Sequence, residues 1–72
     1  MSNDHTKSAI AQAMEILGGR VEDVAVICRV GAPTVTLWLK KGRVSWARDA
    51  IRIAQATAKK GQPVTVEALC GL

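Results

Sequence analysis

Two predicted helices and the turn between them occupy the stretch that decides the fold, VEDVAVICRVGAPTVTLWLK, residues 21–40. Its first part repeats apolar residues at the spacing of one helical face. These residues are Val21, Val24, Ala25 and Cys28. Two short helices that cross at a steep angle need a small side chain at the crossing, and Ala25 supplies it. We therefore expect a helix over residues 21–28.

The second part predicts another short helix, from about Ala32 to Lys40. Pro33 suits its first turn, because the N–H that proline lacks would be unpaired there anyway. Val35 and Trp38 give this helix an apolar inner side, so Trp38 is expected in the core. Its outer side would then be free to meet another molecule.

An amphipathic helix is predicted on the N-terminal side, ending at the glycine pair of residues 18–19. Its apolar face consists of Ile10, Ala13, Met14 and Leu17. Its cap is expected at Asp4, Thr6 or Ser8. Residues 1–5 are expected to be a flexible N-terminus.

A longer helix is predicted on the C-terminal side, from about Trp46 to Lys59, with Ser45 as its N-cap. It carries two apolar stripes, which are Ala47, Ala50, Ile51, Ala54 and Ala58, and Trp46, Ala50, Ile53 and Thr57. Trp46 therefore suits the core or a dimer surface equally. Residues 64–69 fit either a strand or a last helical turn capped by Thr65. Together these elements predict one all-α domain of four to five helices spanning residues 1–72.

Amino-acid composition limits the classes of function that this chain can have. The 72 residues carry a net charge of +4, from ten Lys and Arg against six Asp and Glu, which favours a polyanionic partner, most simply nucleic acid. Cys28, Cys70 and His5 lack the spacing of a metal site, so we expect no metal and no cofactor. No acid–base pair or nucleophile–base arrangement stands out, so no enzyme is predicted. Without a long apolar run we expect no membrane segment, and a reduced cytoplasmic protein.

Three segments resemble a known family, the Cro- and YdaS-type regulators of prophages within the lambda-repressor-like helix-turn-helix group. They are ILGG at residues 16–19, WLKKGRV at residues 38–44 and PVTVEAL at residues 63–69. The resemblance covers about residues 8–69. It implies a compact five-helix domain that binds operator DNA as a phage or prophage transcription regulator, with repression as the expected effect.

The resemblance also implies an interface with double-stranded DNA. The residues expected to face the bases are Ala32, Pro33, Thr34, Thr36 and Leu37. Those expected to hold phosphates are Arg29, Lys40, Lys41, Arg43 and Arg48. A homodimer on a pseudo-palindromic site is expected, because one module of this size contacts few base pairs.

Two departures from the family pattern bear on specificity. Arg29 stands where the family usually has glycine in the turn, and we expect the nearby Gly31 to absorb the strain. The base-facing set holds no Arg, Asn or Gln, the side chains best suited to purines, so DNA shape or dimer spacing would have to contribute. The alternative function is a protein–protein interaction module, antitoxin-like or a phage inhibitor, that reuses the same fold. An activator would share the fold with a larger oligomer.

Overall fold

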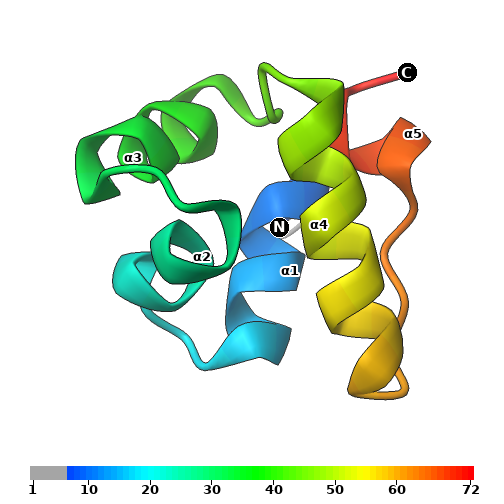
Figure 1. Cartoon of the computed structure of the whole chain (residues 1–72). Helices are drawn as coiled ribbons and strands as arrows, with labels where there is room; N and C mark the ends of the chain where they lie inside the picture. The colour runs from blue at the N-terminus through cyan, green and yellow to red at the C-terminus, as the bar shows by residue number, and fades with distance from the viewer. Residues whose placement is uncertain (1–6) are drawn as a thin grey trace, which may run out of the picture.

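The chain forms five α-helices over residues 7–72, the part that the computed structural model describes (Figure 1). They are α1 (Ala9–Leu17), α2 (Val21–Cys28), α3 (Ala32–Lys41), α4 (Ala47–Lys59) and α5 (Val66–Leu69). No residue of this part forms a strand, so the domain is all-α. The flexible N-terminus predicted for residues 1–5 lies outside the described residues.

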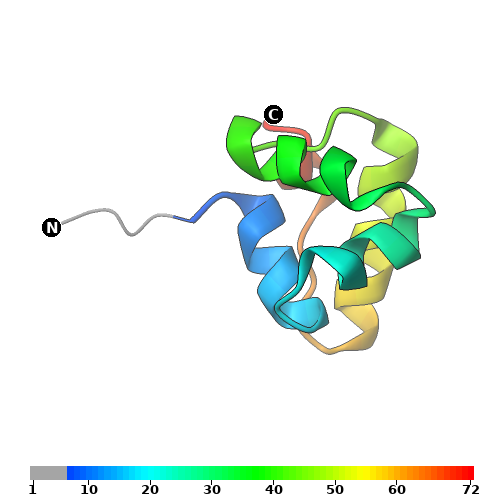
Figure 2. The same cartoon turned by 90° about the vertical axis from the view of Figure 1, so that its left-hand side faces the viewer.

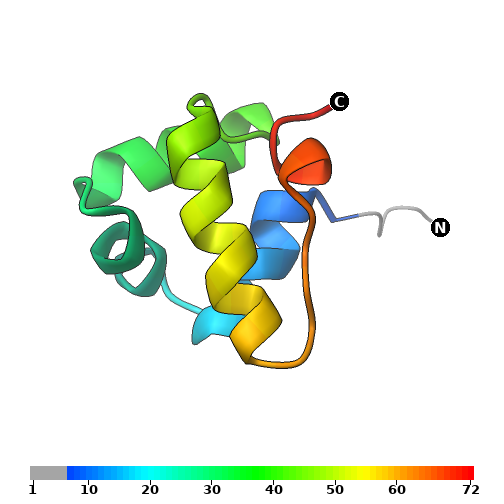
Figure 3. The same cartoon turned by 45° about the vertical axis from the view of Figure 1, so that its right-hand side comes forward.

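Helix α1 is the centre of the arrangement, because it packs against each of the other four helices. In the view of Figure 1, α1 lies between α2 and α3 on the left and α4 and α5 on the right. Figure 3 shows α4 crossing the front of the molecule, with α2 on its left and α1 and α5 on its right. Among these helices, α3 packs only against α1 and α2. Figure 2 shows the consequence: α3 runs along one edge of the molecule, and its far side faces away from the rest of the fold.

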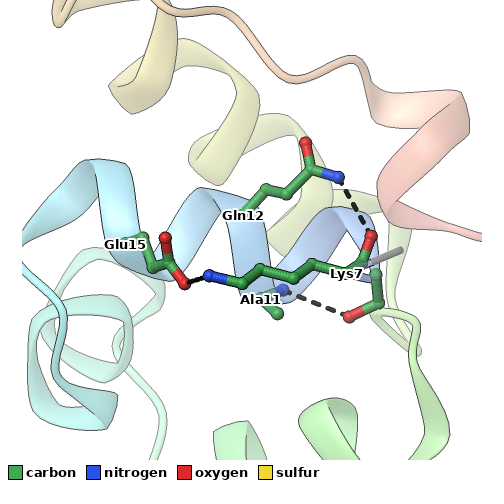
Figure 4. Close-up of polar contacts among 5 residues, drawn as sticks. Lys7, Ala11, Gln12 and Glu15 are labelled. Carbon is green, nitrogen blue, oxygen red and sulfur yellow. Dashed lines mark hydrogen bonds and ion pairs between the residues drawn. The ribbon is translucent and has the colours of Figure 1, made fainter. Parts of the chain in front are cut away.

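The start of α1 is fixed by local hydrogen bonds. The Ser8 hydroxyl accepts a bond from the backbone N–H of Ala11 at 3.3 Å, so Ser8 is the N-cap among the three residues predicted for it. The other two, Asp4 and Thr6, lie outside the described residues. Figure 4 shows this cap beside two further contacts: Lys7 pairs with Glu15, and its carbonyl accepts a bond from Gln12 at 2.9 Å.

Two features of the turn favour glycine at the end of α1. Gly18 has a φ of 140°, a conformation that side chains other than hydrogen disfavour. A Cβ added to Gly18 would also lie 2.3 Å from an oxygen of the Asp23 carboxylate, well inside contact distance. The tight turn therefore brings the end of α1 against the first turn of α2, where an acidic residue also favours the helix dipole.

The core is built around Trp38 of α3, which is almost completely buried, as its helical spacing predicts. Fully buried side chains from all five helices surround this part of the fold: Ile10, Ala13, Val24, Val35, Ala50, Ile53 and Leu69. Cys28 belongs to the same cluster and serves there as a small apolar residue.

Helix α4 uses only one of its two predicted stripes for the core. The buried side includes Ala50, Ile53 and Thr57, while Ile51 is 45% exposed. One prediction at its start is wrong, and one of the two alternatives left open there is excluded. The N-cap is Trp46 rather than Ser45, because the helix begins one residue later than the serine requires. The Trp46 side chain is 60% exposed, which excludes the core for it, and the dimer surface stays a prediction.

The last segment is helical, which settles the alternative left open by its short alternating pattern. The Thr65 hydroxyl accepts a bond from the Ala68 N–H at 3.1 Å and caps α5. The carbonyl of Leu69 accepts a 2.7 Å bond from the N–H of Val44, which ties α5 to the loop between α3 and α4. Thr57, fully buried, accepts a 3.0 Å bond from the Val64 N–H and anchors the chain leading to α5.

Candidate nucleic-acid interface

The turn between α2 and α3 is closed by a non-glycine residue in the left-handed conformation. Arg29 has φ 57° and ψ 43°, and the next N–H, that of Val30, donates to the carbonyl of Ala25 at 3.0 Å. The prediction that Gly31 absorbs the strain is wrong, because its φ of −76° is ordinary for any residue. The cost, about 1–2 kcal/mol, therefore falls on Arg29 itself.

A contact with α4 holds this turn in place. One guanidinium nitrogen of Arg52 donates to the carbonyl oxygen of Cys28 at 3.0 Å. That oxygen belongs to the last residue of α2, whose carbonyl has no partner within its own helix. The bond therefore fixes the start of the turn to α4, and with it the direction in which α3 leaves.

The outward side of α3 brings together four of the five residues predicted to face bases. These four residues line a shallow surface depression of about 480 Å³ together with Lys40, which is one of the phosphate candidates. The full lining is Ala32, Pro33, Thr36, Leu37 and Lys40. Thr34, the fifth residue predicted to face bases, is half-buried and does not line this depression. The Thr36 hydroxyl donates to the carbonyl of Ala32 at 3.1 Å, so its proton is used within α3 while its oxygen can still accept a hydrogen bond.

Cations stand at both ends of this outward side. Lys40 and Lys41 are exposed in the last turn of α3, and Arg43 is exposed just after it. Arg29 is exposed in the turn, three residues before the helix begins. The 10 residues of α3 include no Asp or Glu, so no carboxylate on the helix offsets these charges. The result is a neutral helix face, about 15 Å long, with positive charge at either end.

Arg48, the remaining phosphate candidate, projects from the first turn of α4. Its side chain is 71% exposed, and its Nε lies 3.8 Å from a carboxylate oxygen of Asp49. It therefore belongs to a different helix from the other candidates, although it remains exposed to a polyanion. The N-termini of α2 and α3 have no side-chain cap, but neither offers a ready phosphate site. In α3, Pro33 lacks an N–H and the N–H of Thr34 donates to the carbonyl of Gly31 at 3.0 Å, and in α2 the first turn carries Glu22 and Asp23.

A buried carboxylate beneath this region escaped sequence reasoning. Asp49 is fully buried, and neither of its oxygens accepts a hydrogen bond from the described residues. The thiol of Cys28 donates to its backbone carbonyl at 3.7 Å. Burial raises the pKa of the Cys28 thiol to about 11, the Asp49 carboxylate adds to the rise and Arg52 opposes it. The sequence did contain a signal for its burial. Asp49 is one residue before Ala50 and four before Ile53, so helical spacing places it on the buried face of α4.

The described residues hold no group of three or more His, Cys, Asp and Glu placed to bind a metal ion. Cys28 and Cys70 are both free thiols. None of the helices described combines the length and the apolar character that crossing a membrane requires. Comparisons with protein-family models, with curated proteins and with solved structures found no match to this chain.

Proposed function

We propose that this chain is a DNA-binding transcription regulator of the phage or prophage type, acting as a repressor. Helices α2 and α3 would form a lambda-repressor-like helix-turn-helix, with α3 in the major groove. One observation carries the proposal: α3 packs only against α1 and α2 and leaves a carboxylate-free side exposed between cations.

The dimensions of α3 suit a major groove. The groove of B-form DNA is about 12 Å wide and admits a helix, and phosphates line both of its edges. A helix of 10 residues spans about 15 Å, so charges at its two ends lie near opposite edges. In this arrangement Arg29 would meet one strand, and Lys40, Lys41 and Arg43 would meet the other. Phosphate contacts of this kind set affinity and position, and they carry no base information.

Base recognition would depend on apolar contact and shape. Leu37, 46% exposed, and the methyl group of Thr36 are suited to thymine methyl groups. Pro33 is exposed on the same side and offers no hydrogen-bond donor. We therefore propose modest selectivity for T-containing steps and for DNA shape, with a homodimer supplying the rest through the spacing of two half-sites.

A second function is a protein-interaction module, and the depression on α3 favours it. Its lining includes Ala32, Pro33 and Leu37, an apolar patch that another protein could cover. Salt separates the two functions. DNA binding falls by orders of magnitude with rising salt, whereas burial of apolar surface does not.

The experiment that tests the proposal is a binding-site selection from random duplex DNA, carried out with the parent and three variants. We expect Arg43→Ala to weaken binding similarly on all sequences, because a phosphate contact is independent of the base. We expect Leu37→Ala and Thr36→Val to change the preferred bases. If the parent enriches no sequence and binds no duplex at low salt, the DNA proposal is wrong. If all three variants select and bind like the parent, the interface lies elsewhere.

A further inference from the structure

A second concave surface lies between α2 and α4, away from the outward side of α3. Helices α2 and α4 pack against each other and lie next to each other in the view of Figure 3. The groove has a volume of about 430 Å³, and its lining is Ile27, Arg29, Arg52, Gln55, Ala56 and Lys59. We call it the α2–α4 groove. The aliphatic side chains of Ile27 and Ala56 are half-buried in it, whereas Arg29, Gln55 and Lys59 are exposed.

The charge of the α2–α4 groove is of one sign. Three of its lining residues are cationic, and none is acidic. On α4 the cations Arg52 and Lys59 share one edge of the helix, while Asp49, the only carboxylate of that helix, is buried. The bond from Arg52 to the Cys28 carbonyl holds its guanidinium in position before any partner arrives. A cation held this way loses less entropy on binding.

The shape and composition of the groove limit the classes of molecule that can bind in it. It lies between two packed helices, whose axes are typically about 8–10 Å apart, so a duplex is too broad to enter it. Single-stranded nucleic acid relies on aromatic side chains for stacking, and the groove has none. It is a shallow surface channel and would leave most of a small ligand in water, whereas small-ligand sites enclose their ligands. A peptide segment fits the combination of an apolar floor and cationic edges.

We propose that the α2–α4 groove binds an acidic segment of a partner protein. Carboxylates of that segment would meet Arg52 and Lys59, and one apolar side chain would pack on the floor formed by Ile27 and Ala56. Lys59 lies seven positions after Arg52 on α4, which corresponds to about 10 Å, or two helical turns. A helical partner would therefore present its carboxylates two turns apart on one face. The two proposed surfaces share Arg29, but the contacts proposed for the acidic segment are with Arg52 and Lys59, which are outside the set proposed to meet DNA, so the inference does not depend on DNA binding.

A labelled synthetic peptide tests this inference. The probe is a peptide of about twelve residues in which pairs of glutamates alternate with single leucines, so that it can span the two turns between the cations. Fluorescence anisotropy follows its binding to the full chain. Lys59→Glu should weaken binding about tenfold, because an attraction is replaced by a repulsion. The matched control is Lys60→Glu, which makes the same charge change at the exposed neighbouring residue outside the groove.

Two further measurements separate the groove from net charge. Arg52→Gln removes a groove cation and also the bond to the turn, so Ala56→Glu, which places a negative charge on the floor, provides an independent second variant. A peptide with glutamine in place of glutamate should bind at least about tenfold more weakly. Equal losses for Lys59→Glu and Lys60→Glu would show attraction to overall charge alone and overturn the proposal. Failure of the acidic peptide to saturate the parent at about 1 mM would also overturn it. Neither outcome bears on the selection experiment with duplex DNA.

Discussion

Removal of two cations at the C-terminal end of α3 should change the salt dependence of DNA binding by a calculable amount. Five cations are proposed to meet phosphates: Arg29, Lys40, Lys41, Arg43 and Arg48. Each neutralised phosphate contributes about −0.9 to the slope of log affinity against log salt. Five contacts give a slope of about −4.5, which is a loss of about 500-fold between about 50 and 200 mM salt. The double variant Lys41→Gln and Arg43→Gln leaves three contacts, a slope of about −2.7 and a loss of about 40-fold.

The pair is suited to this test because both side chains are exposed and neither forms an ion pair with another described residue. The variant should therefore fold like the parent, which circular dichroism checks. The assay is fluorescence anisotropy with a labelled duplex over a series of salt concentrations. Lys59→Gln with Lys60→Gln is the matched control, because it removes the same charge from the far end of α4 (Figure 1).

The slope itself decides between the possible results. Retention of the parent slope by the α3 variant would refute the placement of Lys41 and Arg43 on phosphates. An equal change in the control would show that net charge, rather than an interface, governs affinity. Parent binding that is insensitive to salt would contradict the DNA-binding proposal as a whole and would favour the protein-interaction module.

The remaining predictions concern stability and the turn. Gly18→Ala should lower the free energy of unfolding by about 1–3 kcal/mol, because its φ is unfavourable and its Cβ meets Asp23; thermal unfolding measures the loss. Trp38→Ala should cost about 3–5 kcal/mol, enough to leave much of the chain unfolded by circular dichroism. The folded state holds the proton on Cys28 more tightly than the unfolded state, so stability should fall as pH rises from 9.0 toward about 11, and Cys28→Ala should remove this part of the denaturation profile. Arg29→Gly should raise the unfolding free energy by up to about 1 kcal/mol while weakening DNA binding, and a chemical denaturation series with a binding titration separates the two effects.

Sequence patterns predicted the helices because local spacing decides them. The face of α2 and the inner side of α3 follow from apolar residues at helical intervals, and Trp38 is buried as expected. The start of α4 could not be read the same way. Serine is a strong cap by propensity, yet the cap position is set by where the chain enters the helix, and here that residue is Trp46. Tertiary geometry outweighed a local preference.

Tertiary contacts also explain the other differences. Two apolar stripes on α4 looked equivalent in sequence, and only packing against α1, α2 and α5 selected the one containing Ile53. Asp49 was passed over because a charged residue is normally assigned to the surface. The α2–α4 groove was not foreseen either, because Arg29 and Lys59 are far apart in sequence and line one groove only when the helices pack.

Arg29 shows why the turn keeps a residue that strains it. Glycine would adopt a φ of 57° without the cost that a side chain incurs. An arginine there, however, places a cation before the N-terminal end of α3 and in the α2–α4 groove beside Arg52. Strain maintained at one position is best explained by a role that the strained residue performs, and both proposed surfaces give Arg29 such a role. A glycine variant that kept full affinity for duplex DNA and for the acidic peptide would leave the strain without that explanation.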